Sequence, residues 1–136
     1  MTSEKLVYML FLLGLSFNSC AQQDSIIGVW DVKNDYYGAI YEIVEHDHTF
    51  FGKVHYYHDG TTTYHGDDKK EDYFLTAVEA KDKHNIKGKM YMPDGSYYEV
   101  LFNLKDVNTL EATMTVEGQP YTETWTRNTT YNLNND

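Results

Sequence analysis

Histidine and aspartate are the side chains of this sequence that come nearest to a metal-binding pattern. Five of the six histidines lie in the stretch from residue 46 to residue 65. Imidazole and carboxylate groups are ligands of Zn²⁺ and Cu²⁺. The spacing matches no established set of metal ligands, and histidines are common at the ends of surface strands, so we assign no metal and no other cofactor. The side chains concerned are His46, His48, His55, His58 and His65, with Asp47, Asp59, Asp67 and Asp68 beside them.

Catalytic motifs are missing from the sequence. The single cysteine, Cys20, lies outside the part of the chain that we expect to fold, and no serine stands in a Gly-x-Ser-x-Gly nucleophile elbow. The acidic stretch "DDKKEDY" at 67–73 is of a kind that is usually only solvated. There is also no glycine-rich loop for phosphate. We therefore predict that the protein is not an enzyme.

Residues 1–20 are typical of a secretory signal. "MTSEK" is followed by "LVYMLFLLGLSF", a run that is shorter than the roughly 20 apolar residues of a membrane-spanning helix. Cys20 follows this run and resembles the lipobox cysteine of bacterial lipoproteins, which becomes the acylated N-terminus. Lipoboxes prefer Leu three residues before the cysteine, where this chain has Phe17. The alternative is ordinary cleavage nearby, for instance after Ala21, which would release a soluble protein.

The formal net charge of −10 limits the partners of the mature chain. An acidic protein without a basic stripe repels phosphate backbones, so we expect no nucleic acid partner. An anionic lipid surface is repelled in the same way, so attachment to a membrane would have to come from the acyl anchor alone. We expect an exported protein of a bacterial cell envelope, which is lipid-anchored or else periplasmic or secreted.

Period-2 alternation along the chain predicts strands that each have one apolar face. Short turn signals such as "HDG", "MPDG" and "EGQP" separate these strands. Eight or nine such strands predict an all-β fold, a single antiparallel up-and-down barrel over residues 21–128, because closure removes exposed sheet edges. We interpret "HGDDKKEDY" at 65–73 as a long loop and residues 129–136 as a polar C-terminal tail.

Four short motifs make the chain resemble lipocalin-like barrels, in which a Gly-x-Trp opens the first strand and an Arg of the last strand packs on the tryptophan. They also resemble a group of secreted bacterial proteins known as domain of unknown function 2147. The resemblance covers roughly residues 26 to 128 and implies a fold and an exported location, but no established activity. The motifs are "GVW" at 28, "GKV" at 52, "GKMYMPDG" at 88 and "WTR" at 125.

The first and last strands of a closed barrel are neighbours, and this predicts a contact between Trp30 and Arg127. Such a cation–π contact is worth about 1–2 kcal/mol when partly desolvated, and Gly28 would allow the close approach. We interpret these three residues as a closure of the barrel rather than as a ligand contact. The proteins of domain of unknown function 2147 usually carry an Asp-x-x-Asn-Pro segment where this chain reads "HGDDKKEDYFLTAVEA". The resemblance therefore implies no binding property of that loop.

Small barrels either hold one small ligand or fill completely with side chains, and both remain open here. Aromatic and methionine side chains on the inner faces suit a small, largely apolar ligand. Glu123 would need a partner, most simply Arg127 or a tyrosine hydroxyl. The candidate ligand-binding residues are Tyr41, Tyr98, Phe102, Met114, Glu123 and Trp125.

The alternative is a filled barrel that contacts an envelope protein or a glycan through its outer face. Exposed aromatic side chains often mark contact surfaces. No particular protein partner follows from the sequence. The candidates for this outer face are Tyr36, Tyr37, Tyr57, Tyr64, Tyr91 and Tyr97.

Overall fold

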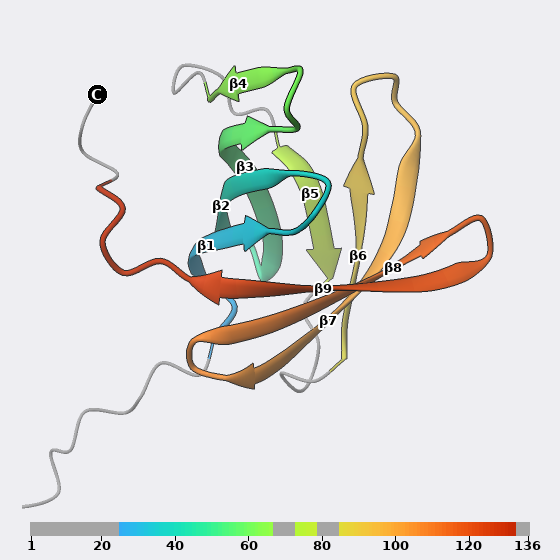
Figure 1. Cartoon of the computed structure of the whole chain (residues 1–136). Helices are drawn as coiled ribbons and strands as arrows, with labels where there is room; N and C mark the ends of the chain where they lie inside the picture. The colour runs from blue at the N-terminus through green and yellow to red at the C-terminus, as the bar shows by residue number, and fades with distance from the viewer. Residues whose placement is uncertain (1–24, 67–72, 79–84, 133–136) are drawn as a thin grey trace, which may run out of the picture.

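The structure is a computed structural model that describes residues 25–66, 73–78 and 85–132, so the predicted signal, Cys20 and most of the charged stretch 65–73 lie outside it. Among the described residues there is no helix that could span a lipid bilayer. The strands are β1 (Gly28–Lys33), β2 (Gly38–His46), β3 (Thr49–His58), β4 (Thr63–His65), β5 (Tyr73–Val78), β6 (Ile86–Tyr91), β7 (Tyr97–Asp106), β8 (Thr109–Val116) and β9 (Gln119–Arg127) (Figure 1).

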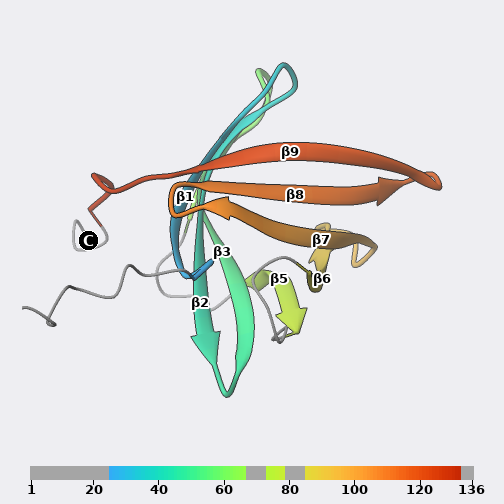
Figure 2. The same cartoon turned by 90° about the horizontal axis from the view of Figure 1, so that it is seen from below.

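Eight of these strands form a closed antiparallel barrel. The ring runs from β1 through β2, β3, β5, β6, β7, β8 and β9 and returns to β1. Successive strands are joined up and down, so the β1–β2 turn and the β2–β3 turn lie at opposite ends of their strand pair (Figure 2). This confirms the all-β up-and-down barrel that the alternation predicted.

The ninth strand, β4, extends one edge of β3. The last residues of β3 pair with β4, and its first residues pair with β5. Because β4 and β5 both run antiparallel to β3, they lie along the same edge in the same direction. His65 ends β4 and Tyr73 begins β5, so the predicted loop 65–73 is a strand at both of its ends.

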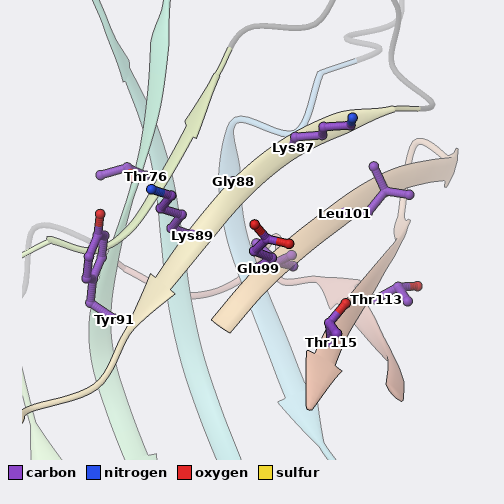
Figure 3. A pocket seen from close by; sticks show the side chains of 10 residues that line it. Thr76, Lys87, Gly88, Lys89, Tyr91, Glu99, Leu101, Thr113 and Thr115 are labelled. Atoms are coloured by element: carbon purple, nitrogen blue, oxygen red, sulfur yellow. The ribbon is translucent and has the colours of Figure 1, made fainter. Parts of the chain in front are cut away.

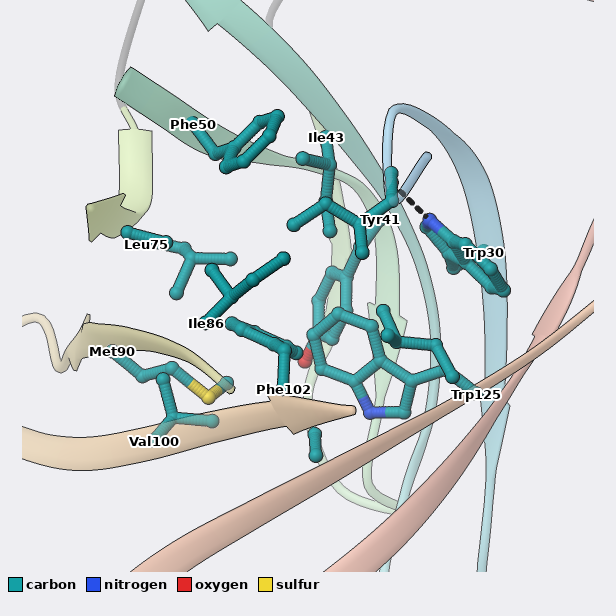
Figure 4. Close-up of a cluster of buried hydrophobic side chains, with 14 of the residues drawn as sticks. Trp30, Tyr41, Ile43, Phe50, Leu75, Ile86, Met90, Val100, Phe102 and Trp125 are labelled. Carbon is teal, nitrogen blue, oxygen red and sulfur yellow. Dashed lines mark hydrogen bonds between the residues drawn. The ribbon is translucent and has the colours of Figure 1, made fainter. Parts of the chain in front are cut away.

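The inward-facing side chains form the hydrophobic core, as the alternation requires (Figure 4). Trp30, Trp125 and Phe102 are completely buried. The ring centroid of Trp125 lies 5.1 Å from that of Tyr41 and 5.4 Å from that of Phe102. Burial of each such side chain contributes roughly 1.5–3 kcal/mol, so this packed centre is a main source of stability.

One end of the barrel is closed by Arg127. Its guanidinium lies 4.4 Å from the ring centroid of Trp30, and the two residues are direct cross-strand partners. It also donates hydrogen bonds to the carbonyl oxygens of Ser25 at 2.6 Å, Ile27 at 2.8 Å and Val107 at 2.6 Å. The side chain therefore joins the start of β1, the end of β9 and the β7–β8 turn.

Gly28 makes room for this side chain. A Cβ atom at residue 28 would lie 2.5 Å from Nη1 of Arg127, so any other residue there would force the guanidinium to shift. Its φ of 137° also favours glycine. The structure thus brings Gly28, Trp30 and Arg127 together at the seam between the first and last strands.

Replacing Arg127 tests how much this seam contributes. We expect Arg127→Ala to lower the free energy of unfolding by about 3 kcal/mol, because it removes three charge-assisted hydrogen bonds and a cation–π contact. Arg127→Lys should recover only part of this loss, since an ammonium lacks the planar fork of donors.

Urea unfolding monitored by circular dichroism measures the difference. The matched control is Lys105→Ala, which removes an exposed Nζ lying 3.6 Å from a carboxylate oxygen of Glu111. Such an exposed pair contributes less than about 1 kcal/mol. An Arg127→Ala loss no larger than that of the control would contradict the assigned role.

Candidate ligand site at the open end of the barrel

At the end of the barrel opposite Arg127, inward-facing side chains are exposed to solvent. This end carries the β1–β2, β6–β7 and β8–β9 turns, and the last two hairpins project in different directions (Figure 1). Tyr98 and Tyr121 face inward there, because their cross-strand partners are the buried Met90 and Met114. Even so, the two tyrosines are 36% and 37% exposed. We call this part of the molecule the open end.

Burial along β9 shows where the filled part of the interior stops. Tyr121, Glu123 and Trp125 share one face of the strand, and their exposed fractions are 37%, 5% and 0%. On β7, Tyr98 is exposed, whereas Val100 and Phe102 are buried. The inward-facing side chains of these strands are therefore buried up to Glu123 and exposed beyond it.

Glu123 is the only buried charged side chain among the described residues. The hydroxyl of Tyr37 donates to its carboxylate, at 2.6 Å from each oxygen. The indole N–H of Trp125 donates to Oε2 at 3.1 Å, and the amide of Asn34 donates to Oε1 at 3.3 Å. The expected tyrosine partner is thus Tyr37, while Arg127 bonds at the other end of the barrel.

The β1–β2 turn places two of these donors. The side-chain oxygen of Asn34 accepts hydrogen bonds from the backbone N–H groups of Tyr36 and Tyr37, at 2.9 and 3.0 Å. This is the local turn that asparagine commonly forms. It folds residues 34–37 over the end of the barrel and directs the Tyr37 side chain toward Glu123.

The assignment of Tyr37 and Tyr57 to the outer face was wrong. Both are partly buried against the core, and their ring centroids lie 5.5 Å apart. The β2–β3 register shifts between Ile40, which pairs with Tyr56, and Tyr41, which pairs with Val54, and this bulge changes which residues of β3 face inward. The remaining outward candidates are exposed, namely Tyr36, Tyr64, Tyr91 and Tyr97.

The candidate ligand-binding residues divide into two groups. Tyr41, Phe102 and Trp125 lie in the packed core and have at most 5% of their surface exposed. Glu123 and Tyr98 lie at the open end, and Met114 lies just below its surface. A molecule at the open end could contact the second group without displacing the first.

Burial raises the pKa of the Tyr37 hydroxyl far above its usual range, and the neighbouring Tyr41 and the bond to Glu123 act in the same direction. Burial likewise raises the pKa of Tyr41. Tyr121 is only partly exposed, and the partial desolvation of its hydroxyl and the negative charge of Glu123 both raise its pKa. Tyr37 therefore remains a hydrogen-bond donor at every physiological pH.

The histidines of 46–65 lie in separate places. His46 and His48 lie at the β2–β3 turn, whereas His58 and His65 lie at the opposite end of β3 and on β4. His55 lies on the outer face, where its Nε2 is 2.9 Å from Oε1 of Glu42. Within the described ranges, no three side chains of the types that bind metals come together. Asp67 and Asp68 lie outside those ranges.

Two pockets formed by the described residues lie on the outside of the barrel. The larger has a volume of about 640 Å³ and crosses the outer faces of β5 to β8 (Figure 3). We call it the outer groove, and its walls include Lys87, Lys89, Tyr91, Leu101 and Thr113. The smaller, of about 340 Å³, lies over the outer faces of β1, β2 and β3.

The described part of the predicted tail, residues 129–132, follows β9 onto the outside of the barrel. Asn128 donates to a carboxylate oxygen of Asp31 at 3.0 Å. The Tyr131 ring centroid lies 5.4 Å from that of His55. The chain thus leaves the barrel across the outer faces of β1 and β3, away from the open end.

Comparison with known proteins agrees with this architecture. A solved structure described as "Protein HP1028 from the human pathogen Helicobacter pylori belongs to the lipocalin family" matches with a TM-score of 0.60 and 21% sequence identity. The match covers 78% of this chain and 84% of that chain. The fold is lipocalin-like. No family model and no curated protein sequence matches the chain.

The buried hydroxyls predict a titration that is coupled to unfolding at high pH. Tyr37 and Tyr41 should ionise only when the protein unfolds, because burial raises the pKa of both hydroxyls. Because their pKa is raised in the folded state, their contribution to stability is complete below about pH 10 and is lost as the pH rises further.

Tyrosinate absorbance measures the ionisation and circular dichroism measures the unfolding, and the two are followed together as the pH rises. We expect a rise in absorbance that coincides with unfolding. Tyr41→Phe should diminish this rise, because it removes one of the two buried hydroxyls. A single rise with the fold intact would show that the two hydroxyls are accessible.

Proposed function

We propose that the protein is an exported lipocalin-like barrel that binds a small, largely apolar molecule at its open end. The supporting observation is that Tyr98 and Tyr121 face the interior but remain more than a third exposed, above buried Met90 and Met114. Aromatic rings and methionines at the mouth of a barrel suit such a ligand. The protein acts by binding and not by catalysis.

The packed core limits how deep this ligand can lie. Trp125, Phe102 and Tyr41 fill the interior below Glu123, with ring centroids about as close as aromatic pairs prefer. A ligand that reached them would have to displace core side chains, at a cost of several kcal/mol. The site we propose is therefore a shallow one, bounded below by Glu123 and Met114.

We further propose that the chain belongs with the proteins of domain of unknown function 2147. The four shared motifs support this because each occupies a defined place in the barrel. The "GVW" motif opens β1, "GKV" lies on β3, "GKMYMPDG" spans β6 and its turn, and "WTR" ends β9.

Export and lipid anchoring complete the proposal, on the evidence of the sequence. The apolar run before Cys20 supports export, and acylation accounts for an unpaired thiol in an exported protein. The anchor would hold the barrel in the cell envelope by its N-terminus. The negative charge of the protein would contribute nothing to membrane binding.

Cys20→Ala tests the anchor. In a bacterium that expresses the full chain and is fed a labelled fatty acid, the wild-type protein should carry the label and fractionate with membranes. The variant should lose both properties, because no thiol remains to be acylated. A wild-type protein without label in the soluble fraction would instead show ordinary cleavage.

A second candidate function rests on the outer groove. Its volume and its mixture of aromatic, apolar and charged walls fit a contact with an envelope protein or a glycan. Lys89 lies 4.6 Å from the ring centroid of Tyr97 at one side of it, so that part of the surface is already ordered. This candidate would need no accessible interior.

Native mass spectrometry of the mature protein, purified from the envelope, separates the two candidates. We expect a mass excess of ligand size that is lost on denaturation. The double variant Tyr98→Ala with Tyr121→Ala should lose this excess, because it removes the exposed rings of the open end.

Leu101→Ala, a change in the outer groove, serves as the control and should retain the bound mass. If Leu101→Ala loses the bound mass and the tyrosine variant keeps it, the groove is the binding site. A bare protein mass, together with no uptake of added fatty acids, fatty amines, fatty alcohols or haem, would contradict a small-molecule function.

A further inference from the structure

Glu123 is a buried carboxylate whose hydrogen-bond partners among the described residues are all neutral. Its three donors are a phenol, an indole and an amide, from Tyr37, Trp125 and Asn34. Buried charges in proteins are normally paired with an opposite charge. Arg127 cannot fill this role, because its guanidinium is bound to backbone carbonyls at the other end of the barrel.

The carboxylate also has acceptor positions that its present donors do not use. Two carboxylate oxygens offer about four acceptor positions. The shortest contacts, from Tyr37, are 2.6 Å long, whereas the amide of Asn34 lies 3.3 Å away on the partly buried β1–β2 turn. An ammonium group could add to these contacts or replace the long one without disturbing Trp125.

Aromatic rings surround the approach to this carboxylate. Tyr121 precedes Glu123 on the same face of β9, and Trp125 follows it. Tyr37 lies across from it, and the ring of Tyr57 is tilted against that of Tyr37, with the centroids 5.5 Å apart. Tyr37 and Trp125 turn their O–H and N–H groups toward the carboxylate, which leaves Tyr121 as the ring whose face an ammonium group at Glu123 could meet.

We propose that the ligand of the open end is a cationic amphiphile, an amine with an apolar body. This inference rests on the function proposed above and specifies its ligand class. The ammonium group binds Glu123 beside the ring of Tyr121, and the apolar body lies along Tyr98 and Met114. The net charge of −10 favours the approach of cations and opposes that of fatty acids.

A matched set of ligands tests the charge. The mature protein is titrated with decylamine, decanol and decanoate below their aggregation concentrations, and tryptophan emission reports binding because Trp125 touches Glu123. We expect decylamine to bind about tenfold or more tightly than decanol, and decanoate more weakly than either.

Glu123→Gln should reduce the binding of decylamine to that of decanol and leave decanol unchanged. Glu99→Gln makes the same change of net charge on the outer wall of the barrel and should keep the preference for the amine. Tyr121→Leu keeps the carboxylate and should weaken the binding of decylamine more than that of decanol. This variant provides the test if Glu123→Gln does not fold.

The outcomes distinguish the inference from the function on which it rests. Equal binding of decylamine and decanol at the open end would overturn the cationic head group and leave the binding function standing. Loss of the amine preference in Glu99→Gln as well would also overturn the inference, because general electrostatic attraction would then explain it. No binding of any of the three would overturn both.

Discussion

The whole barrel depends on the seam between its first and last strands, which is short. β1 and β9 pair over only three residues of each strand, from Trp30 with Arg127 to Val32 with Trp125, whereas β8 and β9 pair over eight. Backbone hydrogen bonds alone would hold such a seam weakly. Arg127 adds the contacts that the backbone does not supply, and a packed core with two buried tryptophans can then form behind it.

The β1–β9 pairing covers only part of β9, and the open end lies beyond the point where it stops. Beyond Val32 and Trp125 the chain of β1 turns away, so the next inward residue of β9, Glu123, has no backbone partner strand on that side. Side chains of the turn take over, because Tyr37 and Asn34 donate to Glu123 where the ladder would have continued. The polar site and the closure are thus two consequences of one short strand pairing.

Alternation and turn signals predicted the barrel, because each strand has one solvated face and the period of two is preserved along most of it. The contact of Trp30 with Arg127 followed from the resemblance to lipocalin-like barrels together with barrel closure. The inward position of Tyr37 and Tyr57 was missed, since one depends on how a turn folds and the other on a bulge in β3. Neither leaves a clear mark on periodicity. The sequence also did not predict how far the packed core extends along the barrel, because this depends on how the side chains of opposite strands fill the interior together.

The choice of glutamate at residue 123 follows from its neighbours. All three contacts come from donors, so a glutamine there would have to turn its amide nitrogen toward one of them. A carboxylate accepts all three, which accounts for its shape and polarity but leaves its charge without a partner. Three neutral donors lower the cost of burying that charge without cancelling it. If Glu123 served only in packing, nothing would offset the remaining free-energy cost of burying its charge. If it binds a cation at the open end, the cation offsets that cost on binding.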